Sequence, residues 1–215
     1  TAERLVDLEP RVVIRRGGLS EVADQVLFEN EVPVAPAEDG TVDPALVAAG
    51  ILAMERGETA LADSIVDLFA STADSMQTAG DTLDARLVRG LGEGLEGYRA
   101  LAAQQPDTAR RHLEAALEKL AGGMGPENAF RTVLAWPLAE LYTRTGRYRE
   151  ALELYASLWD GLHAGPALLR RADIHERLGE ADRARELRTR FLTLWSGADP
   201  EHPLVREARS GLGPG

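Results

Sequence analysis

The sequence contains no cysteine, and aromatic residues make up only 5% of its 215 residues. The lack of cysteine excludes disulfide bonds, thiol catalysis and cysteine metal sites. No stretch approaches the roughly 20 uninterrupted apolar residues that a membrane span needs, so we expect no transmembrane helix. No basic and apolar leader precedes Thr1, and because the chain does not begin with Met we expect a processed protein or a piece of a longer one. An attached domain before residue 1 therefore stays open. For the compartment we favour the cytoplasm, with the periplasm as the alternative if a leader was removed.

Signals of catalysis are also missing. The four histidines stand in no HExxH or HxxxH arrangement, and the serines stand in no GxSxG motif. The glycine-rich residues 89–97 follow no apolar strand, as a dinucleotide site requires, and residues 122–128 lack the Lys-Ser/Thr of a phosphate loop. We therefore predict no catalytic residue, no cofactor and no metal. A hydrolase or transferase that uses carboxylates stays open only because acidic residues are plentiful.

The charge is acidic and unevenly spread. The net charge is −11 for the whole chain, and residues 1–80 account for −10 of it, which disfavours a nucleic-acid partner. Residues 170–190 differ, with seven arginines among five acids. We interpret them as a salt-bridged helix surface, with pairs such as Asp173 with Arg177 and Glu186 with Arg190. The alternative is a basic patch for phosphate or for an acidic peptide.

Two stretches near the C-terminus, residues 138–159 and 170–195, share one pattern at an offset of 33 residues. Each stretch contains a small residue, a ring, a glycine and an alanine, and the spacing between them is the same in both stretches. These residues are Ala139, Tyr142, Gly146 and Ala151 in the first, and Ala172, His175, Gly179 and Ala184 in the second. Small residues let helices approach closely, and glycine permits a left-handed turn. The pattern therefore predicts two helices in a tight hairpin.

The same pattern fits twice more toward the N-terminus. The alanines that mark the second helix of each hairpin are Ala62, Ala109, Ala151 and Ala184, at intervals of 47, 42 and 33 residues. In the second copy Gln104 replaces the turn glycine, and Pro106 opens the second helix. The longer intervals predict longer helices or extra connecting residues in the first two units.

This pattern resembles the tetratricopeptide repeat (TPR) family over about residues 43 to 196. The resemblance implies an all-α fold, a right-handed α-solenoid of antiparallel helix pairs, and a binding scaffold that is not an enzyme. We expect one helical repeat domain over residues 43–215, closed by a capping helix that Asp199 and Pro200 start. We expect residues 1–42 to form an N-terminal capping or linker segment, or else the tail of a preceding domain, with a strand signal at 11–16 and a helix signal at 19–30.

In TPR arrays the first helices of successive units line a concave groove that binds peptides. The resemblance places these candidate partner-binding residues on that face: Tyr98, Trp136, Glu140, Thr143, Arg144, Leu169, Asp173 and Arg177. Such a groove suits a peptide with an apolar anchor and acidic neighbours. The alternative is that its apolar residues pack between units. Pro137 predicts a kink or a helix start beside Trp136.

Two functions remain open. The first is a protein-interaction scaffold whose groove binds a peptide or a partner subunit. The second is a regulatory or sensor module that binds a small ligand and controls an attached domain. Residues 194–209 are similar to the ends of TPR regions in bacterial signalling proteins such as kinases and transcriptional regulators, and by association this similarity supports a regulatory or a scaffold role.

Overall fold

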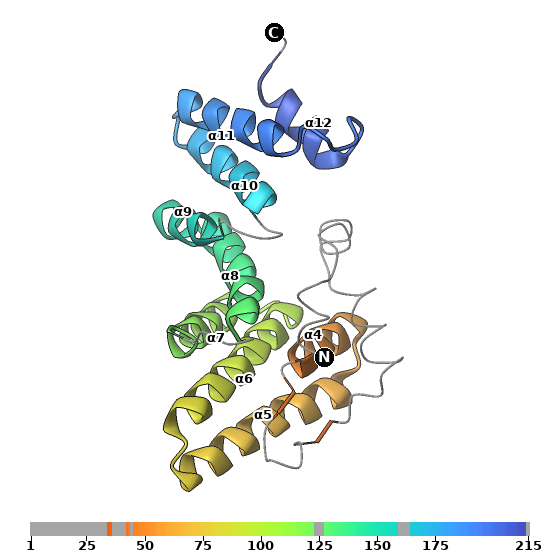
Figure 1. Cartoon of the computed structure of the whole chain (residues 1–215), viewed down its shortest axis with the longest axis vertical. Coiled ribbons are helices and arrows are strands. Elements are labelled where there is room, and N and C mark those ends of the chain that lie inside the picture. Colours follow the sequence, from red (N-terminus) through yellow and green to blue (C-terminus); the bar gives the residue numbers. More distant parts are fainter. Residues whose placement is uncertain (1–33, 36–41, 44, 123–126, 159–163, 214–215) are drawn as a thin grey trace. The chain divides into compact units, whose positions relative to one another are not determined.

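The computed structural model describes residues 34–35, 42–43, 45–122, 127–158 and 164–213. Within these ranges every regular element is an α-helix (Figure 1). The chain divides into two compact units, Thr1–Leu134 and Ala135–Gly215, and each is described here by itself. The strand and helix predicted for residues 11–30 lie outside the described residues.

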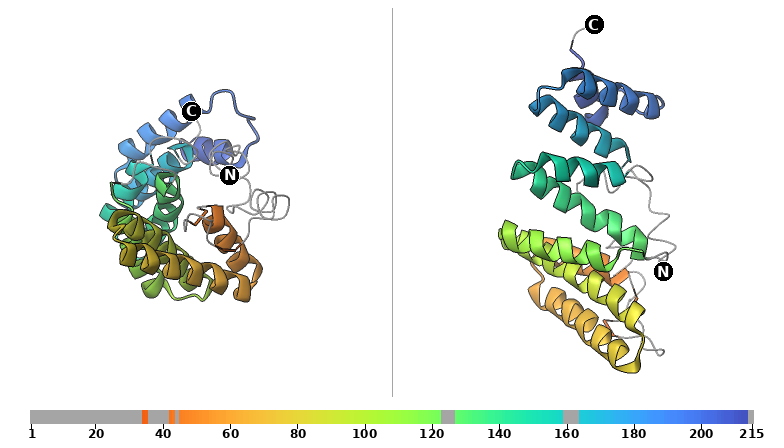
Figure 2. Two further views of the ribbon diagram at one scale, coloured as in Figure 1. Left: turned by 60° about the horizontal axis from the view of Figure 1, so that its bottom comes forward. Right: turned by 90° about the vertical axis from the view of Figure 1, so that its left-hand side faces the viewer.

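The described part of the first unit contains four helices and the first half of a fifth. These helices are α4 (Ala45–Arg56), α5 (Thr59–Ala79), α6 (Thr82–Ala102), α7 (Pro106–Lys119) and the start of α8 (Glu127–Arg144). From α4 to α7, each helix packs against the next along the chain, and α5 lies alongside α6 in both views of Figure 2. Because α5 and α6 have 21 residues each, long helices account for much of the wide spacing of the first two repeats.

Four glycines inside α6 let this helix sit close to its neighbours on several sides. A Cβ at Gly97 would lie 2.7 Å from Leu113 Cγ of α7, and one at Gly94 would lie 2.6 Å from Leu134 of α8. Gly90 faces α7 and Gly92 faces α5 in the same way. The glycine-rich segment is therefore a packing device in the middle of a helix, and the helix itself begins earlier, at Thr82.

Helix α8 passes through Pro137 without starting there, so the helix start, one of the two predicted alternatives, is wrong. A proline has no N–H, and the carbonyl of Val133, four residues earlier, loses its usual donor. The Tyr98 hydroxyl, from α6, donates a hydrogen bond of 3.1 Å to that carbonyl. A side chain from a neighbouring helix thus replaces the missing backbone bond, which lets the helix continue.

The second unit contains the rest of α8 and the helices α9 (Tyr148–Ser157), α10 (Ala164–Arg177), α11 (Ala181–Leu194) and α12 (Pro203–Ser210). The last three share a buried core around Phe191, which is 0% exposed, with Trp195 packed against its edge. The two rings lie 4.9 Å apart between centroids. Helix α12 contributes Val205 and Ala208 to this core. It begins at Pro203 and not at Asp199, because His202 caps its first turn by accepting a bond from the Leu204 N–H.

All four predicted hairpins are present. Their turns contain one residue each with positive φ: Gly57, Gln104, Gly146 and Gly179. The four marker alanines are buried, with exposures of 2%, 0%, 0% and 1%: Ala62, Ala109, Ala151 and Ala184. The all-α architecture of adjacent helix pairs is therefore confirmed, including the weaker second copy.

Candidate functional site

The candidate site lies on the first helices of the last two hairpins, α8 and α10. Helix α8 carries Trp136, Glu140, Thr143 and Arg144, and α10 carries Asp173 and Arg177. Their spacing of three and four residues places each set along one side of its helix. These residues all belong to the second unit.

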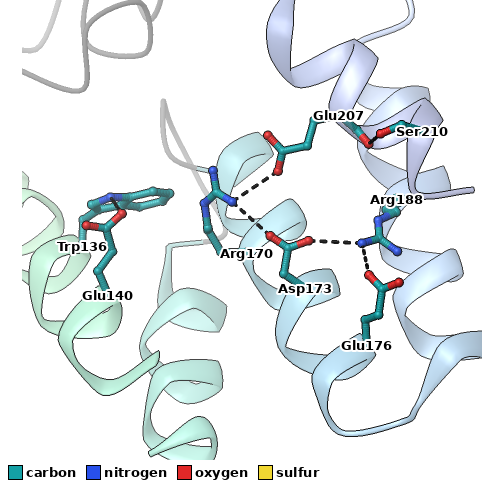
Figure 3. Close-up of polar contacts among 8 residues, drawn as sticks. All are labelled: Trp136, Glu140, Arg170, Asp173, Glu176, Arg188, Glu207 and Ser210. Atoms are coloured by element: carbon teal, nitrogen blue, oxygen red, sulfur yellow. Dashed lines mark hydrogen bonds and ion pairs between the residues drawn. The ribbon is translucent and has the colours of Figure 1, made fainter. Parts of the chain in front are cut away.

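The indole of Trp136 is half-buried and held in one orientation (Figure 3). Its Nε1 donates a hydrogen bond of 3.1 Å to Glu140 Oε1, one turn further along α8. Its ring meets Tyr155 of α9 edge-on, with 5.3 Å between centroids and 73° between planes. An aromatic side chain fixed in this way loses little conformational entropy on binding, which favours its use as an anchor.

Tyr155 of α9 contacts the Trp136 ring and forms a hydrogen bond with Thr143, both of which are on α8. It is 1% exposed, and burial, followed by the negative charge of Glu140, raises the pKa of its hydroxyl to about 12. A hydrogen bond with Thr143 acts in the opposite direction, as does the charge of Arg170. The phenol therefore stays protonated at neutral pH and serves as a neutral hydrogen-bonding group. Tyr155 did not stand out as a site residue in the sequence, because its polar partners come from other helices.

An ion-pair network extends from α10 to α11 and α12 (Figure 3). Asp173 pairs with Arg170 at 3.0 Å and with Arg188 of α11 at 3.2 Å. Arg170 also reaches Glu207 of α12 at 3.2 Å, and Arg188 binds Glu176 at 2.5 Å. Asp173 is thus committed to two arginines within the fold. Sequence reasoning missed Arg170, Arg188 and Glu207, and only the surplus of arginines in residues 170–190 hinted at them.

Arg188 is the buried member of this network, at 7% exposed. Burial by itself lowers the pKa of a guanidinium, but the bonds and charges of Glu176 and Asp173 outweigh it, and the pKa of Arg188 is raised. Its second guanidinium nitrogen donates to the carbonyl of Gly211, just after α12, at 3.2 Å. Arg188 therefore ties the capping helix to the rest of the second unit.

The two ion pairs expected from the sequence are wrong. Asp173 does not pair with Arg177, and Glu186 pairs with Arg183 at 2.7 Å in place of Arg190. Among the residues that the structure describes, Arg144 and Arg177 are exposed and form no ion pair. Both lie in the last turn of a first helix, where they face the negative end of the helix dipole.

Two of the candidate residues have structural roles. Leu169 is only 1% exposed and belongs to the core that α10 shares with α11 and α12, so it cannot contribute contact surface. The alternative of packing, left open by the sequence, holds for this residue. Tyr98 is half-buried in the first unit, where its hydroxyl supports the Val133 carbonyl.

Within the described ranges, no group of three or more His, Asp or Glu side chains is arranged to hold a metal ion. In the same ranges no helix combines the length and apolar character that a membrane crossing requires. Two histidines of the described part lie against a carboxylate. His175 Nδ1 lies 2.6 Å from Glu180, and His112 Nδ1 on α7 lies 2.8 Å from Glu93 on α6, which also pairs with Lys119 at 3.3 Å.

No protein-family model and no curated protein sequence matches the chain. The solved structures that match include TPR-like repeats of a Podosopora anserina putative kinesin light chain, and a variant of the same repeats in which methionine replaces one glutamine. The TM-scores are 0.55 and 0.56, at 18% identity in both cases. Each match covers 79% of this chain, and 85% and 84% of the respective solved chain. The chain has a TPR-like fold. In this TPR-like chain, α4/α5, α6/α7, α8/α9 and α10/α11 are the helix pairs, and α12 follows the last pair.

Proposed function

We propose that this TPR-like chain is a protein-interaction module, and that the first-helix face of its last two pairs binds a peptide or a partner subunit. The face consists of Trp136, Glu140, Thr143 and Arg144 on α8, with Asp173 and Arg177 on α10. TPR-like folds generally bind proteins and are not typically catalytic. The observation that carries the proposal is the pair of exposed arginines, Arg144 and Arg177, which have no ion partner among the described residues.

The rest of the face supports a partner with an apolar anchor and acidic neighbours. Trp136 offers a fixed aromatic edge, and Arg144 and Arg177 offer charge that no carboxylate of the described chain satisfies. Charge pairs across an interface steer association and select the partner. A guanidinium can bind a carboxylate through two parallel hydrogen bonds, which adds geometric selectivity.

Charge reversal tests the proposal. Partners are first captured on the wild-type chain and identified, and their affinity is then measured by calorimetry. The double change Arg144→Glu with Arg177→Glu should weaken binding by about 1 kcal/mol or more, roughly fivefold or more, while thermal stability stays nearly unchanged. The matched control is Arg206→Glu with Arg209→Glu on α12, two exposed arginines away from this face. Equal affinities for the two double variants would place the interface elsewhere.

The regulatory alternative stays a prediction. It requires a small ligand between the helices and an attached domain that responds to the ligand, and no contact of the described residues favours it over the first proposal.

A further inference from the structure

A hollow on the second unit lies between α9, α10 and α11, away from the proposed first-helix face. It is a shallow, open hollow with a volume of about 490 Å³. It is lined by Arg171 and His175, four residues apart on one side of α10, and by Leu178 just after the helix. Asp173 and Arg177 of the first-helix face lie on a different side of α10. The two surfaces can therefore be altered independently.

The floor of the hollow is apolar. Leu152 and Ala156 come from consecutive turns of α9, and Leu178 comes from the turn just after α10. Leu178 is 46% exposed, and large apolar side chains so exposed are few among the described residues. A single exposed leucine on a protein surface is common. A leucine in the floor of a hollow, however, offers a place for an apolar side chain of another molecule.

The rim of the hollow is basic in a chain that carries a net charge of −11. Arg149, Arg171 and Arg183 line it with one acid, Glu153, and Arg183 also pairs with Glu186 of α11 at 2.7 Å. The Arg149 to Glu153 pair is long, at 3.5 Å, and both side chains are mostly exposed to solvent. Such a pair contributes little to the stability of the fold, so Arg149 can readily exchange Glu153 for a carboxylate from another molecule.

Arg171 is the unusual member of the rim. Its Nε is buried and has no hydrogen-bond partner in the part of the chain that the structure describes. Burial lowers the pKa of this guanidinium, and repulsion from Arg183 and Arg190 lowers it further. A buried donor without an acceptor destabilises a fold, and like charges nearby add to that cost. An arginine kept in such surroundings is ready to accept an anionic group.

We propose that this hollow is a second interaction site, which binds an acidic segment of a partner protein. An apolar side chain of the segment enters between Leu152 and Leu178, and its neighbouring carboxylates pair with Arg171 and Arg183. A free inorganic anion would use the arginines but would gain nothing from the apolar floor. A protein segment uses both, which favours it as the occupant.

Fluorescence anisotropy with labelled synthetic peptides tests the site on the whole chain. Each peptide carries one Leu or Phe flanked by Asp and Glu, and each has a counterpart in which Asn and Gln replace the acids. We expect acidic peptides to bind at least tenfold more tightly than their counterparts. If no acidic peptide exceeds its counterpart, or if inorganic phosphate alone stabilises the chain through Arg171 while the peptides do not bind, the proposal is overturned.

A matched pair of variants locates the binding. Arg183 and Arg185 lie on α11, each is more than half exposed, and each pairs with an acid three residues away, but only Arg183 lines the hollow. Arg183→Met should weaken the acidic peptides at least tenfold, and Arg185→Met should leave them unchanged. Leu178→Glu should abolish peptide binding, because it places a charge in the apolar floor of the hollow. Equal effects of the two arginine changes would contradict the assignment.

Arg171→Met separates a binding role from a structural one. The change removes a buried unsatisfied donor and a repelled charge while it keeps most of the apolar stem. We expect the melting temperature to rise and acidic-peptide affinity to fall at least tenfold. A lower melting temperature, or full affinity, would show that Arg171 serves the fold and not a ligand.

Discussion

The α6/α7 hairpin of the first unit and the α10/α11 hairpin of the second have the same turn built from different residues. The first turns at Gln104, with φ of 58°, and the second at Gly179, with φ of 79°. In both, the residue after the turn donates to a carbonyl five residues earlier: Gln105 to Ala100 and Glu180 to His175, each at 2.8 Å. The turn is therefore defined by its backbone hydrogen bond, and a side chain at the left-handed position is tolerated at a cost.

The two hairpins also bring their helices together differently. In α6 the contacts with α7 are made where Gly90 and Gly97 have no side chain at all. In α10/α11 the buried small residues are Ala172 and Ala184, at 0% and 1% exposed. Glycine permits the closer approach but weakens a helix, whereas alanine supports it. The comparison predicts that the first unit is more sensitive to added volume at its small residues than the second.

The largest expected effect is at the closest contact of the first unit. Gly97→Val should destabilise by about 3 kcal/mol, because the new Cβ would lie 2.7 Å from Leu113 Cγ and 3.4 Å from its backbone nitrogen. Chemical denaturation measures the change. Gly197→Val is the control, since a Cβ there would meet no heavy atom within 4 Å. A loss of less than about 1 kcal/mol at Gly97 would mean that α6 and α7 can separate without cost.

A somewhat smaller loss of stability is expected in the second unit, where alanine in place of glycine lies at the contact between paired helices. Ala151 is 0% exposed at the start of α9, so Ala151→Leu should destabilise by about 2 kcal/mol through overpacking. Ala181→Leu, at an exposed position in the first turn of α11, should be close to neutral in the same denaturation experiment. Similar stabilities for the two variants would show that the hairpin interface is not at Ala151.

The smallest effect concerns the two kinds of turn. Gln104→Gly should stabilise the chain by about 0.5 kcal/mol, because glycine relieves the left-handed strain but also gains freedom in the unfolded chain. The reverse change, Gly146→Gln in the α8/α9 turn with φ of 75°, should destabilise by about 1 kcal/mol. Thermal melts of the two variants should shift in opposite directions. Shifts of the same sign would refute the equivalence of the turns.

Much of the fold could be predicted because its signals are local. The four marker alanines and the turn residues, including Gln104 in place of glycine, were all located from spacing along the sequence. The start of α12 could not be located in this way, since either Pro200 or Pro203 can open a helix. The helix begins at Pro203 because the ring nitrogen of His202 caps the Leu204 N–H. The continuity of α8 through Pro137 depends on a tyrosine 35 residues before the carbonyl that it supports.

The candidate site was harder to predict than the fold. Helical spacing identified the side of α8 that holds Trp136 and Glu140, and these two residues do interact. It failed for Leu169, because a side chain near the edge of a helical face can turn into the core when a later helix covers it. For the hollow between α9, α10 and α11, the only signal in the sequence was the excess of arginine. A salt-bridged helix surface explains that excess equally well.

By itself, the sequence determined the number and pairing of the described hairpins, because small residues and turn residues act within one or two helical turns. Only the tertiary structure decided which charges pair between helices. Asp173 pairs with Arg188 across 15 positions of the chain, and Arg170 reaches Glu207 across 37, whereas Arg177, four residues from Asp173, has no ion partner in the described ranges. Ion pairs form between the groups that helix packing brings into reach, and the partners that packing supplies to α10 come from helices further along the chain.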